Sequence, residues 1–190
     1  MSHKIGGPAM YENIRFETER LVIRSFTEND LNHLNRIVND KKIMSNVPFA
    51  EERTLDECKA LLGRILSRYG ESTSDEFKGF LLLVELKENS EQIGTVGLFP
   101  LTYNAIETEI FYGLFEEYYG MGYATEIGKS IIKYALYDMS ISKVVATVNE
   151  KNTHSKRVLE KLGMKFEYII NDTDGSSYDG EQMYSVCKIG

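Results

Sequence analysis

The chain has 190 residues, of which 42% are apolar and 27% are charged, and it carries a net charge of −7. Its size and apolar content predict one globular domain with its own core and exclude a largely disordered chain. The acidic balance argues against nucleic acid as a partner, because nucleic-acid binders usually present a basic surface. No stretch resembles a secretory signal or a membrane span, so we expect a cytoplasmic protein without membrane contact.

The first residues, MSHKIGGPAM, have no periodicity. We interpret residues 1–9 as a leader or cloning scar and residues 10–190 as the folded domain. Cys58 and Cys187 lie far apart without paired spacing and are predicted to be reduced thiols. The histidines have no further ligands at metal-binding spacing, so we expect no metal site.

The apolar pattern predicts the elements in chain order, with strands marked by alternation or short apolar runs and helices by repeats of three and four residues. They are a strand (20–26), two helices (beginning after Thr27 and Thr54), three antiparallel strands (80–86, 93–99 and 106–115), a helix (124 to about 138), a strand (143–149), a short helix (152–163) and two closing strands (165–170 and 181–189). Thr27 with Asp30, and Thr54 with Glu57, have the spacing of helix N-terminal caps.

This order predicts a single α/β (α+β) domain with a mixed, mostly antiparallel, twisted sheet flanked by about four helices. A dinucleotide-binding fold is excluded, because its glycines would follow the first strand within repeating βαβ units.

The segment YYGMGYATEIGK has Gly120, Gly122 and Ala124 at alternate positions just before a predicted helix. Amides at a helix N-terminus are free to bind an anion, small side chains let a phosphate approach, and the helix dipole favours it. A tight turn that needs glycine conformations explains the same residues equally well. The spacing alone leaves both interpretations open.

Four motifs in order resemble the GNAT superfamily of acyl-CoA-dependent N-acetyltransferases, and within it the ribosomal-protein N-terminal acetyltransferase branch. They are TERLVIRSFTENDL, IGTVGL, EIFYGLFEEYYGMGYATE and NEKNTHSKRVLEKLGM, and the resemblance covers the chain from Phe16 onward. It implies acetyl-CoA as co-substrate, with Leu114 pairing through its main chain with the pantetheine arm and Asn152 contacting the arm from the other side. The amides implied to hold the pyrophosphate are those of Tyr119, Gly120, Met121, Gly122, Tyr123, Ala124 and Thr125.

Glu109 is our candidate general base, because an amine must be neutral before it attacks a thioester. It alternates with Glu107 along a predicted strand, so the two carboxylates share a face and their repulsion is expected to raise one pKa. The other interpretation is a solvated sheet face with two ordinary carboxylates.

Ser155 is our candidate for stabilising the departing thiolate, since it shares a helical face with Val158 and Leu159. A hydroxyl that only caps or packs the helix is the other interpretation. The chain departs from many superfamily members, which have a tyrosine acid where Leu159 stands. Glu116 and Glu117, just before the glycines, oppose a bound anion unless they point outward.

We therefore expect transfer of an acetyl group from acetyl-CoA to a primary amine by direct attack in a ternary complex, with a protein or peptide N-terminal amine as acceptor. Acetylation of a small amine (polyamine, amino acid or antibiotic), a non-catalytic acyl-CoA sensor and a nucleotide-phosphate enzyme are the alternatives. The first two helices and the late hairpin are expected to border the acceptor, and we allow for a homodimer.

Overall fold

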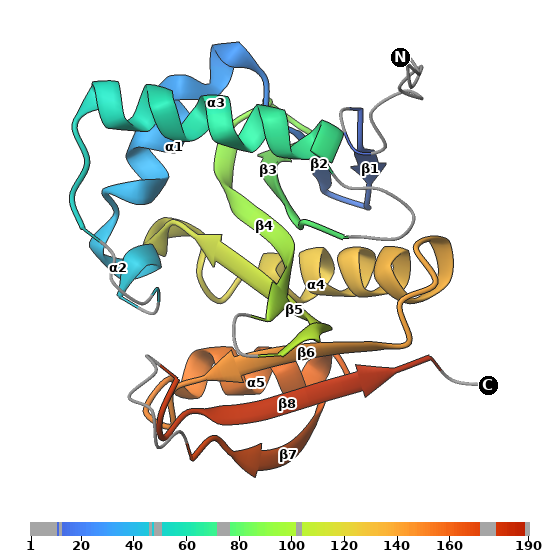
Figure 1. The fold of residues 1–190 in the computed structure, drawn as a ribbon. Coiled ribbons are helices and arrows are strands. Elements are labelled where there is room, and N and C mark those ends of the chain that lie inside the picture. Colours follow the sequence, from blue (N-terminus) through green and yellow to red (C-terminus); the bar gives the residue numbers. More distant parts are fainter. Residues whose placement is uncertain are drawn as a thin grey trace, which may run out of the picture.

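The computed structural model describes residues 11, 13–45, 47, 51–71, 77–101, 104–171 and 178–188. In this part of the chain, eight strands form one sheet in the order β1-β2-β3-β4-β5-β6-β8-β7, with helices on both faces (Figure 1). The strands are β1 (Arg15–Glu17), β2 (Leu21–Ser25), β3 (Phe80–Leu86), β4 (Gln92–Leu101), β5 (Asn104–Leu114), β6 (Lys143–Val148), β7 (Lys165–Ile169) and β8 (Gln182–Cys187). The helices are α1 (Leu31–Val38), α2 (Lys41–Met44), α3 (Leu55–Glu71), α4 (Tyr123–Lys133) and α5 (Thr153–Lys161), with 3-10 turns η1 (Glu28–Asp30) and η2 (Glu116–Tyr118) and a π-helical turn η3 (Tyr134–Asp138).

The predicted fold class is confirmed. Among the described strands every neighbouring pair is antiparallel except β5 and β6. Five α-helices stand in the described ranges where about four were expected, because α2 is a single short turn that Asp40 caps by accepting from the amides of Lys42 and Ile43. Residues 1–9 and most of the predicted hairpin turn at 171–180 lie outside the described residues.

Both predicted helix caps are present. The Thr27 amide donates to Asp30 Oδ2 at 2.7 Å, and the Thr54 amide donates to Glu57 Oε2 at 2.7 Å. The Glu57 amide in turn donates to Thr54 Oγ1. These bonds satisfy amides that have no partner inside the first helical turn, which explains why the helices begin there.

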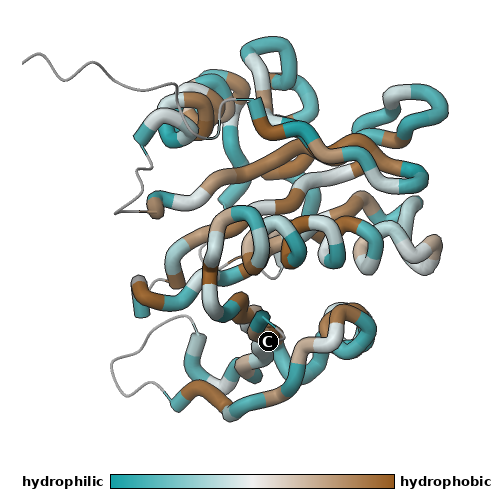
Figure 2. Tube along the Cα trace, turned by 90° about the vertical axis from the view of Figure 1, so that its right-hand side faces the viewer, coloured by the Kyte–Doolittle hydropathy of each residue, from teal (hydrophilic) through white to brown (hydrophobic). Residues whose placement is uncertain are grey.

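The sheet separates two apolar clusters. Alternate residues of β3 show the division, since Leu82 and Val84 pack in the cluster that contains α4, whereas Leu83 packs in the cluster that contains α1. Hydrophobic segments accordingly gather in the strands between the helices (Figure 2). Helices α4 and α5 thus cover one face of the sheet, and α1 covers the other with most of α3.

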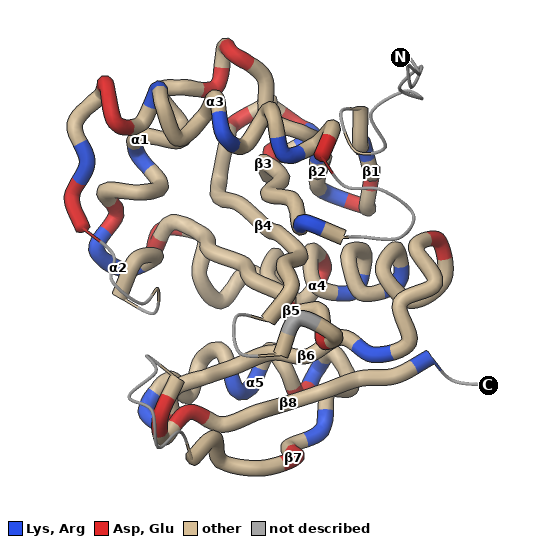
Figure 3. The backbone as a smooth tube through the Cα atoms, in the orientation of Figure 1, with Lys and Arg blue, Asp and Glu red and all other residues tan. Residues whose placement is uncertain are grey.

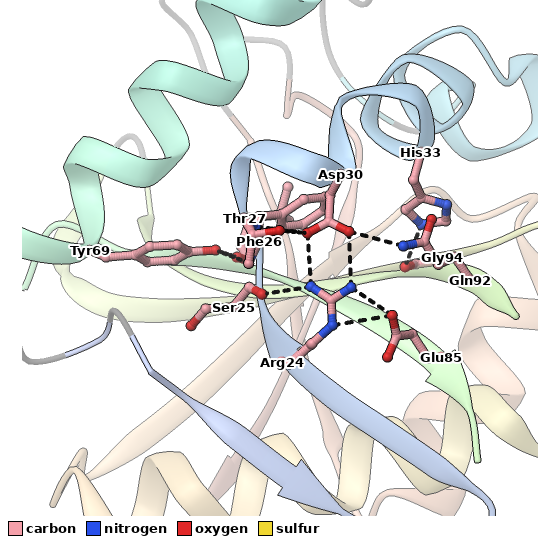
Figure 4. A network of polar contacts seen from close by, with 11 residues as sticks. Arg24, Ser25, Phe26, Thr27, Asp30, His33, Tyr69, Glu85, Gln92 and Gly94 are labelled. Atoms are coloured by element: carbon pink, nitrogen blue, oxygen red, sulfur yellow. Dashed lines mark hydrogen bonds and ion pairs between the residues drawn. The ribbon is translucent and has the colours of Figure 1, made fainter. Parts of the chain in front are cut away.

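A polar network fastens the start of α1 to the sheet (Figure 4). The Arg24 guanidinium donates to both carboxylate oxygens of Asp30, at 2.8 and 2.9 Å, and to Glu85 at 2.6 Å. Gln92 also donates to Asp30, at 2.9 Å. Asp30 is only 3% exposed, so its charge is balanced by these partners rather than by water.

Charges of both signs are interspersed along the outer helices and loops (Figure 3). Within the described residues, no helix combines the length and the apolar character that a membrane span requires.

We expect Asp30→Asn to lower the free energy of unfolding by about 3 kcal/mol at pH 7, because it leaves the half-buried Arg24 short of a counter-charge. Burial alone would raise the pKa of Asp30, but hydrogen bonds from Arg24 and Thr27 outweigh it and lower the pKa from 3.8 to about 2. The stabilisation is therefore present above pH 4 and is lost as the pH falls through 2.

Urea unfolding of both proteins at pH 7 and pH 2.5 measures this difference, with the exposed Asp138→Asn as a control that should stay near wild type. A gap between wild type and Asp30→Asn that is equal at both pH values would contradict the role of the charge.

Candidate active site

The sheet opens between β5 and β6. These parallel strands pair only at Thr108 with Val144 and at Glu109 with Val145. Beyond Glu109, residues 110–114 of β5 pair with β4 alone among the described strands, while β6 continues beside β8 (Figure 1). The main chain of β5 therefore presents one unpaired edge toward the opening, which ends at Leu114.

Glu109 lies at the apex of this opening. The Thr147 amide of β6, which has no β5 backbone partner beyond this point, donates to Glu109 Oε1 at 3.1 Å. The Thr147 hydroxyl donates to the same oxygen. The carboxylate thus replaces the backbone acceptor that a continued ladder would have supplied.

Burial raises the pKa of Glu109, and the two hydrogen bonds from Thr147 only partly oppose this. The charge of Glu181, just before β8, adds to the rise. We expected a raised pKa from repulsion by Glu107, and that cause is wrong. Glu107 instead forms an ion pair with Lys143 Nζ at 2.8 Å.

Ser155 lies in the first turn of α5. Asn152 caps this helix, with its Oδ1 accepting from the Ser155 amide at 3.1 Å. The inward face predicted for Ser155 is confirmed, since it is partly buried and Leu159 on the same face is 2% exposed. Burial raises the pKa of the Tyr112 hydroxyl on β5, and the nearby Ser155 side chain partly opposes this, although the two form no hydrogen bond of normal geometry.

The glycine segment between η2 and α4 is held open. Gly120 and Gly122 have φ values of +76° and +84°, a region that favours glycine. A Cβ built on Gly120 would meet no atom within 4 Å, and one on Gly122 would meet only Arg20 Nη2 at 3.5 Å. Gly128, by contrast, has a packing role, because its Cβ would lie 2.5 Å from Leu162.

The amides of this segment have no acceptors. Within the described part of the chain, none of the N–H groups of residues 120–125 donates a hydrogen bond. The Tyr119 amide, which we had included in the set, donates to Glu116 O at 3.0 Å because it closes the η2 turn. The open amides therefore run from Gly120 to Thr125 at the N-terminus of α4, where the helix dipole favours an anion.

Arg20 fixes this segment from outside. It donates to Met121 O at 2.9 Å, pairs with Glu126 of α4 at 2.7 Å and lies over the Tyr123 ring at 4.4 Å. Thr18 also donates to Glu126. Burial would raise the pKa of Glu126, but the hydrogen bonds from Thr18 and Arg20 outweigh it and lower the pKa, so the clamp stays charged at neutral pH.

The two carboxylates before the glycines are each paired with a cationic side chain. Glu116 lies 3.4 Å from Lys42, and Glu117 pairs with Arg36 of α1. Arg36 also stacks over the Phe115 ring at 3.6 Å. These ion pairs offset the negative charge that the sequence places beside an anion site.

A family model described as acetyltransferase (GNAT) domain matches residues 20–165. The chain belongs to the GNAT acetyltransferase family. It is 23% identical over 175 residues to the uncharacterized N-acetyltransferase YoaA of Bacillus subtilis, which covers 90% of this chain and 96% of the relative. This GNAT chain is therefore an N-acetyltransferase.

Two solved structures share the fold. One is the spermidine N-acetyltransferase of Vibrio cholerae in complex with CoA and spermine, with a TM-score of 0.71 and 19% identity over 90% of this chain and 96% of the other. The second is the ribosomal-protein-S5-alanine acetyltransferase of Vibrio fischeri, with a TM-score of 0.71 and 19% identity over 92% of this chain and 97% of the other.

We expect Gly122→Ala to destabilise the protein by about 1 kcal/mol, because alanine is strained at positive φ although space is available for its methyl group. Gly63→Ala in α3 is the matched control, since its Cβ also meets nothing within 4 Å and a helix interior favours alanine. Chemical denaturation should show the two variants shifting in opposite directions. A loss of stability in both would refute the backbone explanation.

Proposed function

We propose that this GNAT acetyltransferase transfers the acetyl group of acetyl-CoA to a primary amine by direct attack in a ternary complex. The observation that carries the proposal is the run of open amides from Gly120 to Thr125. It follows directly, through η2, from the strand that borders the opening of the sheet. A long ligand with a diphosphate at one end and a reactive group at the other matches this arrangement.

The residues fit coenzyme A at both ends. The amides of residues 120–125 supply donors for the pyrophosphate, and the bare surface over Gly120 lets a phosphate approach the main chain. The unpaired edge of β5 up to Leu114 supplies main-chain groups for the amides of the pantetheine arm. Asn152 lies on the opposite side of the opening, at the start of α5.

Acetyl-CoA supplies the activated thioester. Glu109 removes a proton from the amine, and its raised pKa brings its basicity closer to neutral pH. A backbone amide among residues 112–114 polarises the carbonyl. Ser155 donates a hydrogen bond toward the departing sulfur, and alignment of the two substrates in the opening supplies much of the remaining rate.

For the acceptor we propose the N-terminal amine of a protein or peptide. The motifs of the ribosomal-protein branch support it, and so does the fold shared with the alanine acetyltransferase of Vibrio fischeri. A polyamine is the second candidate, because the spermidine enzyme of Vibrio cholerae shares the fold with the same TM-score of 0.71.

CoA is expected to stabilise the protein and thereby raise its melting temperature, whereas ATP and NAD at equal concentration should not. At a CoA concentration of a hundred times the dissociation constant, the stabilisation is about 2.7 kcal/mol. Met121→Glu should weaken this effect, since it places a negative charge beside the open amides on a side chain that is 51% exposed. Met121→Gln, whose side chain has the size of glutamate without its charge, should respond to CoA like wild type. Stabilisation by ATP or NAD in place of CoA would favour a nucleotide-phosphate enzyme.

Glu109→Gln should lower kcat about 100-fold in a CoA-release assay while CoA still raises the melting temperature. In wild type, kcat/KM should fall as the pH drops through the raised pKa of Glu109. In the variant, this acidic decline of kcat/KM should be absent. Glu107→Gln is the control with activity retained, because that carboxylate pairs with Lys143.

The acceptors for this assay are peptides beginning with alanine or serine, the same peptides with blocked N-termini, and spermidine. Faster turnover of the free peptides supports the proposed acceptor, and faster turnover of spermidine supports the polyamine. Binding of CoA without release from any amine would indicate an acyl-CoA sensor.

A further inference from the structure

Tyr112 has a buried hydroxyl that the fold does not satisfy. Its Oη atom has no hydrogen-bond partner among the described residues, and Gln182 Oε1 is the other buried side-chain atom in that condition there. Buried donors are nearly always paired, because leaving one unpaired costs stability. A hydroxyl kept in this state at the edge of the opening calls for a functional explanation.

The position of Tyr112 on β5 supplies one. It lies beyond Glu109, in the part of the strand that β6 does not pair. Residues three apart on a strand point to opposite faces of the sheet. Tyr112 therefore shares a face with Ile110 and Leu114, which pack with α4 and α5, while Glu109 points to the other side.

On that face the Tyr112 hydroxyl lies near Ser155 in the first turn of α5, without a hydrogen bond of normal geometry between them. Glu109 thus lies on one face of the sheet at the opening, and the hydroxyl groups of Tyr112 and Ser155 lie on the other. This is the arrangement that direct attack needs, with deprotonation on the side of the incoming amine and hydrogen-bond donors on the side of the leaving group.

We propose that Tyr112 is a positioning residue for acetyl transfer, whose hydroxyl turns to donate to Ser155 Oγ when the substrates are bound and thereby directs the Ser155 proton toward the departing sulfur of CoA. The inference rests on the proposed function. Tyr112 supplies a phenol from a strand, whereas many superfamily members have one on the helix at the position of Leu159.

The chemistry balances without a proton leaving either hydroxyl. The amine nitrogen forms its bond to the acetyl carbon, the carbon–sulfur bond breaks with its electron pair on sulfur, and the amine proton passes to Glu109. Solvent returns a proton to the released thiolate. Burial raises the pKa of Tyr112 to about 12, which the interaction with Ser155 only partly opposes. Because a thiol has a pKa of about 8.5, Tyr112 serves as a neutral donor and not as the acid.

The test is Tyr112→Phe, with Tyr134→Phe as the control for removing a phenol from the same apolar cluster. We expect kcat to fall about tenfold, the value for one lost hydrogen bond in the transition state, with the KM for acetyl-CoA within about twofold of wild type. The melting temperature without ligand should stay level or rise, because the change removes an unsatisfied buried group. The shape of the pH profile should not change.

The double variant with Ser155→Ala should be no slower than Ser155→Ala alone, since Tyr112 acts through that hydroxyl. The inference would be overturned if Tyr112→Phe kept the wild-type kcat, or if the effects of the two substitutions multiplied in the double variant. It would also be overturned if Tyr112→Phe lowered the melting temperature and weakened CoA binding. A wild-type protein that releases no CoA with any amine would overturn the proposed function as well, so the two failures are distinguishable.

Discussion

The separation of β5 from β6 beyond Glu109 is the constraint on which the rest of the site depends. Two parallel strands that stop pairing leave backbone groups unsatisfied on both sides. One of these, the Thr147 amide, is satisfied by the Glu109 carboxylate, which draws an ionisable side chain into the apex of the opening. The same separation exposes the main-chain edge of β5, where the buried Tyr112 hydroxyl has no hydrogen-bond partner among the described residues. A local break in the pairing of the sheet thus positions the carboxylate, the strand edge and the hydroxyl to which we assign roles in the proposed reaction.

Two ionic clusters keep the elements around this opening in place. Arg24 with Asp30 and Glu85 joins α1 to β2 and β3. From α1, His33 Nε2 lies 3.3 Å from Gly94 O, and Gly94 pairs with Leu114 at the end of β5. On the other face, Arg20 and Glu126 tie the start of β2 to the start of α4. The glycine segment is therefore shaped by side chains more than one hundred residues away in the sequence.

Local patterns were sufficient to predict what depends on neighbours in sequence. Alternation placed β3 at its observed bounds, and the helical repeat gave Ser155 its inward face. The capping pattern located the start of α3 and that of η1, the 3-10 turn that leads into α1. The short β1 and α2 carry too few residues for a period to show. Contacts between distant segments were beyond such patterns. The Arg20–Glu126 pair, the Thr147 bonds and the neutralisation of Glu107 by Lys143 depend on which elements the fold brings together. For that reason the raised pKa of Glu109 was predicted with the wrong cause.

The parallel ladder between β5 and β6 is only two residue pairs long, yet it is the strand-to-strand connection between the meander β1–β5 and the ladder of β6, β8 and β7. Such a short ladder adds little stability of its own, so we expect partial opening of the native state to begin at the segment from β6 to β8. A ligand that lies between the two strands and hydrogen-bonds to both adds contacts that hold the two parts together. We therefore expect occupancy by the ligand and the cooperativity of unfolding to be thermodynamically linked, with the bound ligand making the two parts unfold more nearly as one unit.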